Sequence, residues 1–295
     1  MKLPIFVHIP KTAGSSIRTL ISSNYSETEV LSLYGSHLEI LQQSRTHIGN
    51  LSQFRLIQGH TPYGTHRFLG SQNLRYFSFL REPVSRTLSD IAHSTRHPSH
   101  GFHHVFNVPE SGIQTKIEAA GRICYYRNNM THFLSGNFYT EEISLNDFSV
   151  AVDNLWRSEF VGISEHFEKS VLIMGKMLGW SRFIPQKCNV RPDAGFPVTE
   201  EISASCSKFL DYDLQLYAIA LDEFEKKSRK YGSHLNEAAE QLHQIIQQQM
   251  QDHPAVQFFV DYFVGDPTIV SLKEYEEKIP VNSPLANWIK LSSPA

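Results

Sequence analysis

The hydrophobic residues in the N-terminal part of this chain follow two different spacings. Short apolar runs rich in β-branched and aromatic residues predict buried strands at 3–9, 54–57 and 76–80. Residues 15–21, after the first run, repeat at the spacing of one helix face, and a second helical stripe follows Pro83 after the third run. Strands that alternate with helices predict βαβ units in a parallel sheet.

The alternation continues through the middle of the chain. A fourth strand is predicted at 160–163 and a helix at 167–178, and helical spacing also covers 116–134 and 199–230. The segment 93–112 is rich in His, Pro, Ser and Gly, and we expect it to be a surface excursion. The pattern therefore indicates an α/β fold with a central, mainly parallel sheet flanked by helices. Ligands of such sheets bind at the carboxyl ends of the strands.

The last part of the chain differs from the rest. From Gly232 a Gln-rich helical stretch leads to a Pro-containing end, without a clear linker before it. We expect one domain at 1–231 and a helical C-terminal extension at 232–295 that either packs on it or acts as a linker.

The overall charge limits the kind of partner. The chain has 41% hydrophobic and 19% charged residues, as in an ordinary globular protein, and a formal net charge of −3. This balance does not favour nucleic acid or a membrane surface as a partner, so an anionic ligand would need a local site. The 3 cysteines are far apart and suggest neither a zinc ribbon nor a disulfide framework. With no long apolar stretch either, we expect a cytoplasmic protein or a piece of a larger one.

The segment between the first strand and its helix has the chemistry of an anion site. It reads His-Ile-Pro-Lys-Thr-Ala-Gly-Ser-Ser over 8–16. Backbone N–H groups at a helix start hold anions, and Lys11 adds a mobile charge. The Walker A pattern GxxxxGK[ST] does not fit, because Lys11 precedes the Gly. An ordinary helix start with serine caps is the alternative interpretation.

Two further strand ends carry candidate residues. His60 follows Gly59 after the second strand, and His is the side chain best suited to take a proton near neutral pH. Arg81 ends the third strand and Ser89 lies in the next helix, so a guanidinium and a hydroxyl could bind one phosphate. Taken alone, each could equally be an ordinary structural residue.

Together these segments resemble the sulfotransferases that use 3′-phosphoadenosine 5′-phosphosulfate (PAPS), in the branch of heparan sulfate 2-O-sulfotransferase and related bacterial enzymes. HIPKTAGSS resembles the 5′-phosphosulfate loop of that family, FLREPVSRTLSD its 3′-phosphate segment, and QGHTPYG the segment with its catalytic base. Looser matches are NNMTHFLSG, FVGISEHFEKSVLIMGKMLGW and DYDLQLYAIALDEF. The resemblance spans about 3–230 and implies a P-loop-like, three-layer fold.

The resemblance also implies roles for individual residues. His60 would be the general base and Lys11 would stabilise the leaving group. The donor would be bound by Pro10, Lys11, Thr12, Ala13, Gly14, Ser15, Ser16, Arg81, Ser89, Val190 and Arg191. The sulfuryl group would pass to a hydroxyl of a carbohydrate or a carrier-bound hydroxyacyl chain, leaving adenosine 3′,5′-bisphosphate (PAP), with no metal required.

Two other functions stay open on the sequence, namely a non-catalytic nucleotide-binding protein on the same fold and, less in keeping with the motifs, a P-loop kinase. The histidines of the surface excursion match no strong zinc template; they are His93, His97, His100, His103 and His104. Several aromatic residues could line an acceptor pocket or belong to the core; they are Tyr63, Phe68, Tyr125, Tyr126 and Phe133.

Overall fold

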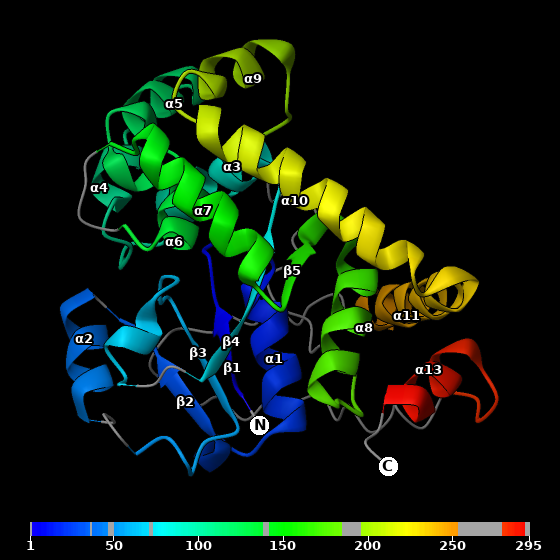
Figure 1. Ribbon diagram of the computed structural model, residues 1–295. Helices are drawn as coiled ribbons and strands as arrows, with labels where there is room; N and C mark the ends of the chain where they lie inside the picture. Colours follow the sequence, from blue (N-terminus) through cyan, green and yellow to red (C-terminus); the bar gives the residue numbers. More distant parts are fainter. Residues whose placement is uncertain are drawn as a thin grey trace.

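A parallel five-stranded sheet forms the centre of the computed structural model, which describes residues 2–35, 37–46, 50–70, 73–137, 142–184, 196–252 and 279–292. The strand order is β2-β3-β1-β4-β5, and every pairing between neighbours is parallel. The strands are β1 (Leu3–Val7), β2 (Val30–Leu33), β3 (Leu56–Gly59), β4 (Leu74–Leu80) and β5 (Phe160–Ile163). The predicted α/β class with a parallel central sheet and flanking helices is confirmed (Figure 1).

Helices connect and cover these strands. They are α1 (Gly14–Asn24), α2 (His37–Thr46), α3 (Pro83–Arg96), α4 (His103–Phe106), α5 (Ile113–Gly121), α6 (Asn129–Ser135), α7 (Leu145–Arg157), α8 (Phe167–Leu178), α9 (Glu200–Ser207), α10 (Asp211–Arg229), α11 (Gly232–Asp252) and α13 (Pro284–Ser292). The predicted strand at 160–163 and helix at 167–178 have the bounds of β5 and α8. The strand β2 was not predicted.

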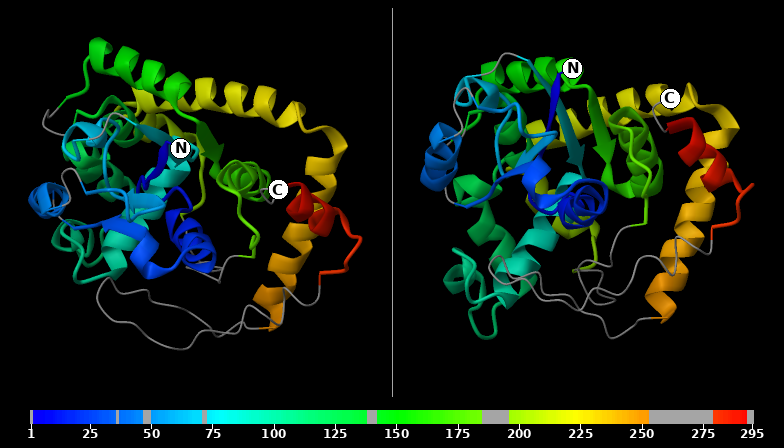
Figure 2. Two further views of the ribbon diagram at one scale, coloured as in Figure 1. Left: turned by 60° about the horizontal axis from the view of Figure 1, so that its bottom comes forward. Right: turned by 90° about the horizontal axis from the view of Figure 1, so that it is seen from below.

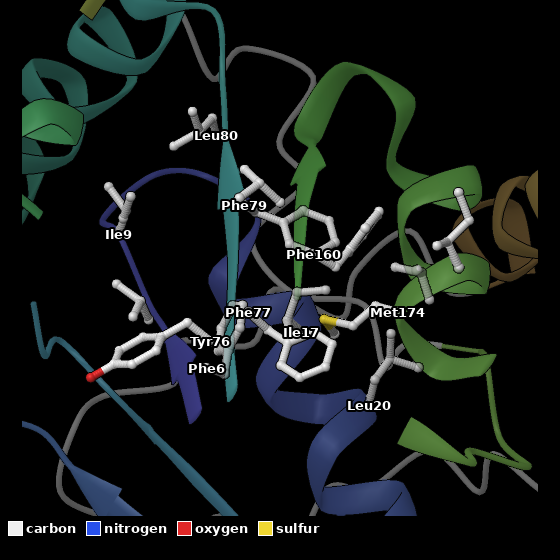
Figure 3. Packing of buried hydrophobic residues seen from close by; sticks show 14 of the residues in the cluster. Phe6, Ile9, Ile17, Leu20, Tyr76, Phe77, Phe79, Leu80, Phe160 and Met174 are labelled. Carbon is white, nitrogen blue, oxygen red and sulfur yellow. The ribbon is translucent and has the colours of Figure 1, made fainter. Parts of the chain in front are cut away.

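The main hydrophobic core lies where α1 and α8 pack on the strands (Figure 3). Ile17 and Leu20 of α1 are fully buried and face the aromatic side chains of Phe77 and Phe160, while Met174 of α8 closes the cluster. These strands are apolar on both faces because helices cover both, as is usual for parallel sheets. The core thereby fixes α1, and with it the segment that enters α1.

A second hydrophobic cluster lies beyond the carboxyl end of β4, where α3, α4, α5 and α9 gather (Figure 1). Phe106, within the predicted surface excursion, is fully buried there because α4 packs on α3. Tyr126 belongs to this cluster, whereas Phe133 lies in the main core and Phe68 is 44% exposed. The segment 93–112 is therefore partly buried in the core, although its many histidines and other polar residues had indicated a surface segment.

Two predicted helical stretches are interrupted. The stretch 199–230 divides into α9 and α10, and 116–134 into α5 and α6. Asn128, in the left-handed conformation, precedes α6, and its amide donates to the Asp211 carboxylate at the start of α10 (3.0 Å). The buried Asp213 carboxylate accepts the N–H groups of Met130 and Thr131. Polar contacts between α6 and α10 therefore set these breaks.

The C-terminal helices α11 and α13 lie against α8, on the far side of the molecule from α4 and α5 (Figures 1 and 2). Leu235, Leu242, Leu285 and Trp288 are buried members of the main core. The division at residue 231 stays a prediction, but the described part of 232–295 shares its core with the sheet. None of the described helices combines the length and the apolar character that crossing a bilayer requires.

Candidate active site

The candidate site lies at the carboxyl edge of the sheet, beside β1. The chain turns to β3 and β2 on one side of β1 and to β4 and β5 on the other, so the strand order reverses at β1. Loops diverge at such a point and leave a crevice in which open α/β sheets bind ligands. The β1–α1 loop (8–13) and the turn after β4 at Arg81 flank this point, as predicted from the sequence.

The backbone of the β1–α1 loop is held in an uncommon shape. Lys11 and Ala13 have positive φ angles of 68° and 65°, where non-glycine residues are rare. Ala13 is the N-cap of α1, and its methyl side chain cannot cap the first N–H groups of the helix. Unusual backbone and uncapped N–H groups at one helix start are features of anion sites.

The side chains of this loop divide into inward and outward groups. Thr12 is fully buried and its hydroxyl donates to the Ile9 carbonyl (2.9 Å), so it braces the loop from within. Ser15 and Ser16, in the first turn of α1, are partly exposed. Of the predicted hydroxyl donors of this loop, Ser15 and Ser16 are thus the ones that solvent can reach.

Two arginines anchor the loop from the β4–α3 side. The Arg81 guanidinium donates to the Lys11 carbonyl (3.2 Å). Arg86, fully buried, reaches the Pro10 carbonyl (3.4 Å) and pairs with Asp90 on the same helix (3.4 Å). The structure thus joins the two motifs that the sequence analysis placed separately, and it adds Arg86, which that analysis did not single out.

Positive charge is concentrated around Lys11. Burial lowers the pKa of Lys11, and the guanidinium groups of Arg81, Arg96 and Arg86 lower it further, while Asp90 acts in the opposite direction. The pKa of Arg81 is also lowered, chiefly by burial. The ammonium and guanidinium groups repel one another. Asp90 near Lys11, and Glu165 and Glu82 near Arg81, offset part of this repulsion, and a bound polyanion would relieve more of it.

The start of α3 is closed by its own cap. The Glu82 carboxylate accepts the N–H groups of Val84 (3.0 Å) and Ser85 (2.7 Å). An anion at this end would therefore be held by side chains rather than by the helix terminus. Ser89, two turns into α3, is partly exposed, as is Arg81. Arg81 and Ser89 are thus accessible from solvent, and their role in binding a 3′-phosphate stays a prediction.

His60 directly follows β3, and its backbone N–H donates to the Leu33 carbonyl of β2 (3.1 Å). Gly59 permits this approach, because a Cβ there would lie 2.0 Å from the Leu33 carbonyl oxygen. Burial lowers the pKa of His60 to about 4, with a smaller contribution from Arg18. His60 is therefore neutral near pH 7, and the same burial makes its ring a weaker proton acceptor than an exposed imidazole.

Two residues that the sequence analysis did not assign surround His60. His8 follows β1, with its ring centroid 4.6 Å from that of His60. Tyr34 follows β2, with its ring 5.0 Å from His60 and its hydroxyl 3.0 Å from Nδ1 of His8. The Arg18 guanidinium lies 4.6 Å over the Tyr34 ring. His8 begins the segment HIPKTAGSS that the sequence analysis singled out, whereas Tyr34 follows β2, which was not predicted.

Of the remaining residues named from the sequence, His93 lies close enough to Lys11 to interact with it, and two others fall outside the described residues. Val190 and Arg191 are outside the described residues. His93 and His97 have ring centroids 4.1 Å apart, and burial together with Lys11 and neighbouring histidines lowers the pKa of His93 to about 3. Among described residues, no group of three or more His, Cys, Asp or Glu side chains could hold a metal ion.

Comparisons with known proteins add little. The chain matches no protein-family model and no curated protein. Among solved structures it is similar to the crystal structure of mouse sulfotransferase SULT7A1 complexed with PAP, at 12% identity and a TM-score of 0.35. The match covers 70% of this chain and 64% of that one, so the chain spans less than two thirds of that neighbour. A likeness at this level carries no argument about function, which rests on the site.

Proposed function

We propose that this protein is a sulfotransferase that moves the sulfuryl group of PAPS to an acceptor hydroxyl. The observation that carries the proposal is the joining of three strand ends at one edge: Lys11 after β1, His60 after β3 and Arg81 after β4. Their order and chemistry correspond to the motifs that resemble the PAPS-dependent enzymes. The pairing of β1 with β4 supports the proposal, because the first and third of them follow neighbouring strands.

The donor would be bound through both of its charged ends. The 5′-phosphosulfate would occupy the β1–α1 loop, contacting the first N–H groups of α1, the hydroxyls of Ser15 and Ser16, and Lys11. The 3′-phosphate would lie against Arg81 and Ser89. The repulsion among the cations around Lys11 favours a ligand with several negative charges.

In the reaction, the acceptor oxygen attacks sulfur in line with the bond to the bridging oxygen of the 5′-phosphate. A new S–O bond forms to the acceptor, the bond to the phosphate oxygen breaks, and PAP leaves with the electron pair. His60 takes the acceptor proton on a ring nitrogen. Lys11 and the loop N–H groups stabilise the charge that grows on the leaving oxygen, so the residues act through positioning and electrostatics.

The identity of the acceptor is the part of the proposal that depends most on the resemblance to known sulfotransferases. We propose a hydroxyl of a carbohydrate or of a carrier-bound hydroxyacyl chain, as in the branch of heparan sulfate 2-O-sulfotransferase and its bacterial relatives. Release of PAP from PAPS with a hydroxylated polysaccharide, compared with release with a β-hydroxyacyl pantetheine thioester, would separate the two.

The variant His60→Ala tests the assignment of the base. The rate of sulfuryl transfer should fall by about 10²–10⁴-fold, because a positioned base contributes that much. Affinity for PAP, measured by calorimetry, should stay within about threefold, since the proposed donor contacts remain. His104→Ala is the matched control, because His104 is exposed and outside the site. Normal turnover by His60→Ala would reject the base, and absence of PAP binding by the unaltered protein would reject the function.

A further inference from the structure

Three neighbouring strands end at the same level of the sheet, and the residue after each of them has a ring in its side chain. In the registers of β1 with β3 and of β2 with β3, Val7 and Leu33 are both paired with Gly59. The next residues along the three strands are His8, Tyr34 and His60. Equivalent positions on parallel strands present side chains to the same face of a sheet. The register therefore brings these rings together.

The three rings form a closed group. Ring centroids are separated by 4.6 Å between His8 and His60, 5.6 Å between His8 and Tyr34, and 5.0 Å between Tyr34 and His60. All three pairs meet edge to face, with interplanar angles of 67°, 80° and 77°. This is the favourable geometry for aromatic rings, and each ring limits the rotation of the other two.

His8 is the member that reaches the β1–α1 loop. It is only 6% exposed, and its backbone N–H donates to the Gly59 carbonyl (2.8 Å), one residue before His60. On its other side the imidazole packs on the first residue of α1, since a Cβ at Gly14 would lie 1.8 Å from Nε2 of His8. One buried ring thus contacts the proposed donor loop, His60 and Tyr34.

The polar edge of His8 has a defined partner. Nδ1 of His8 and the Tyr34 hydroxyl are 3.0 Å apart, so this buried imidazole has a hydrogen bond that fixes its plane. The Arg18 guanidinium lies over the Tyr34 ring and also holds it in place. Rotation of His8 would break the hydrogen bond and move the surface on which His60 packs.

We propose that His8 is a positioning residue that, through its hydrogen bond to Tyr34, holds the His60 ring in place relative to the β1–α1 loop. The inference rests on the proposed function, in which His60 takes the acceptor proton beside a donor bound to that loop. His8 itself need not touch either substrate. Its contribution is the orientation of the base, to which rates of proton transfer are sensitive.

Matched substitutions separate the hydrogen bond from the ring. Tyr34→Phe and His8→Phe each keep an aromatic ring and remove the bond, so kcat should fall by about tenfold in each, while PAP affinity stays within about threefold. The double variant should lose no more than either single one, because both remove the same interaction. His8→Asn can still reach the Tyr34 hydroxyl and should recover most of the lost kcat.

The His60→Ala background provides the test that a purely structural role would not pass. Without the base ring there is nothing to position, so Tyr34→Phe should cause no further fall in the residual rate. A tenfold fall there as well, or an unchanged kcat for Tyr34→Phe with His60 present, would overturn the proposal. Circular dichroism and urea unfolding identify variants that do not fold, and Tyr34→Phe serves if His8→Phe does not.

Failure of the proposed function gives a different result. If the unaltered protein neither binds PAP nor releases it from PAPS, the sulfotransferase assignment falls. The ring signals of His60 in NMR spectra of histidine-labelled protein then test the positioning directly. Tyr34→Phe and His8→Phe should both shift these signals, and His8→Asn should restore them. Unchanged His60 signals in both Phe variants would reject the inference whatever the enzyme does.

Discussion

At the scale of single residues, Gly14 shows how closely the β1–α1 loop is packed. An added Cβ would lie 1.8 Å from Nε2 and 1.9 Å from Cδ2 of His8, so the imidazole would have to move. Its φ angle is not in the left-handed region, and the requirement for glycine is therefore one of space. The loop thus depends on the absence of a side chain at the first residue of α1.

Gly14→Ala should consequently destabilise the protein, although alanine is the better helix former. We expect the free energy of unfolding in urea to fall by about 1–3 kcal/mol, the usual cost of overpacking a buried site. Combining it with His8→Ala should recover part of this loss, because the ring that clashes is gone. Gly101→Ala is the control, since a Cβ there meets nothing within 4 Å. A neutral Gly14→Ala would show that the ring moves at no cost.

The histidines of the site also make stability depend on pH. Burial lowers the pKa of His60 to about 4 and that of His93 to about 3, below the ordinary value of 6.5. Below pH 6.5 the unfolded chain takes up protons that the folded protein does not, so the free energy of unfolding should decrease from pH 6.5 toward pH 4. Urea unfolding at pH 7, 6 and 5 measures this, and His60→Gln should show a weaker dependence. If His60→Gln showed the same pH dependence as the unaltered protein, His60 would not be a source of that dependence.

At the scale of elements, strands with long or fully apolar runs were easier to predict than the short strand β2. Leu74–Leu80 and Phe160–Ile163 were found because long or fully apolar runs mark buried strands. The four residues of β2 include the exposed Ser32, and their pairing with β3 is a long-range contact that local pattern does not encode. Tyr34 was not considered for that reason. Lys11, His60 and Arg81 were singled out because each follows a predicted strand, and their roles stay predictions.

The helix α3 carries a buried ion pair between Arg86 and Asp90, and Arg86 also holds the β1–α1 loop through the Pro10 carbonyl. Arg86 and Asp90 are 0% and 1% exposed, and Nε of Arg86 has no hydrogen-bond partner among the described residues. Removing one partner leaves a buried charge unpaired, so Arg86→Met and Asp90→Asn should each cost about 3–5 kcal/mol in urea unfolding. The double variant Arg86→Met/Asp90→Asn should lose less than the sum. Additive losses would show that the two side chains act independently.

At the scale of the whole molecule, the C-terminal helices bear on the predicted division at residue 231. The Trp288 indole of α13 is 3% exposed and donates to the Leu172 carbonyl of α8 (3.2 Å). The Lys176 ammonium of α8 lies 4.8 Å from the centre of the Trp288 ring. Since α8 packs on β5, the extension is continuous with the sheet through one helix.

Trp288→Ala should therefore destabilise the entire protein rather than release α13 alone. We expect a loss of about 3–5 kcal/mol, as for other buried tryptophans, and one cooperative urea transition in both proteins, followed by far-ultraviolet circular dichroism and by the fluorescence of the remaining tryptophans. Leu291→Ala is the control on the same helix, because Leu291 is 66% exposed, and it should change stability by less than about 0.5 kcal/mol. Two separate transitions, with the one that belongs to residues 1–231 unaffected by Trp288→Ala, would instead mark 232–295 as an independent extension.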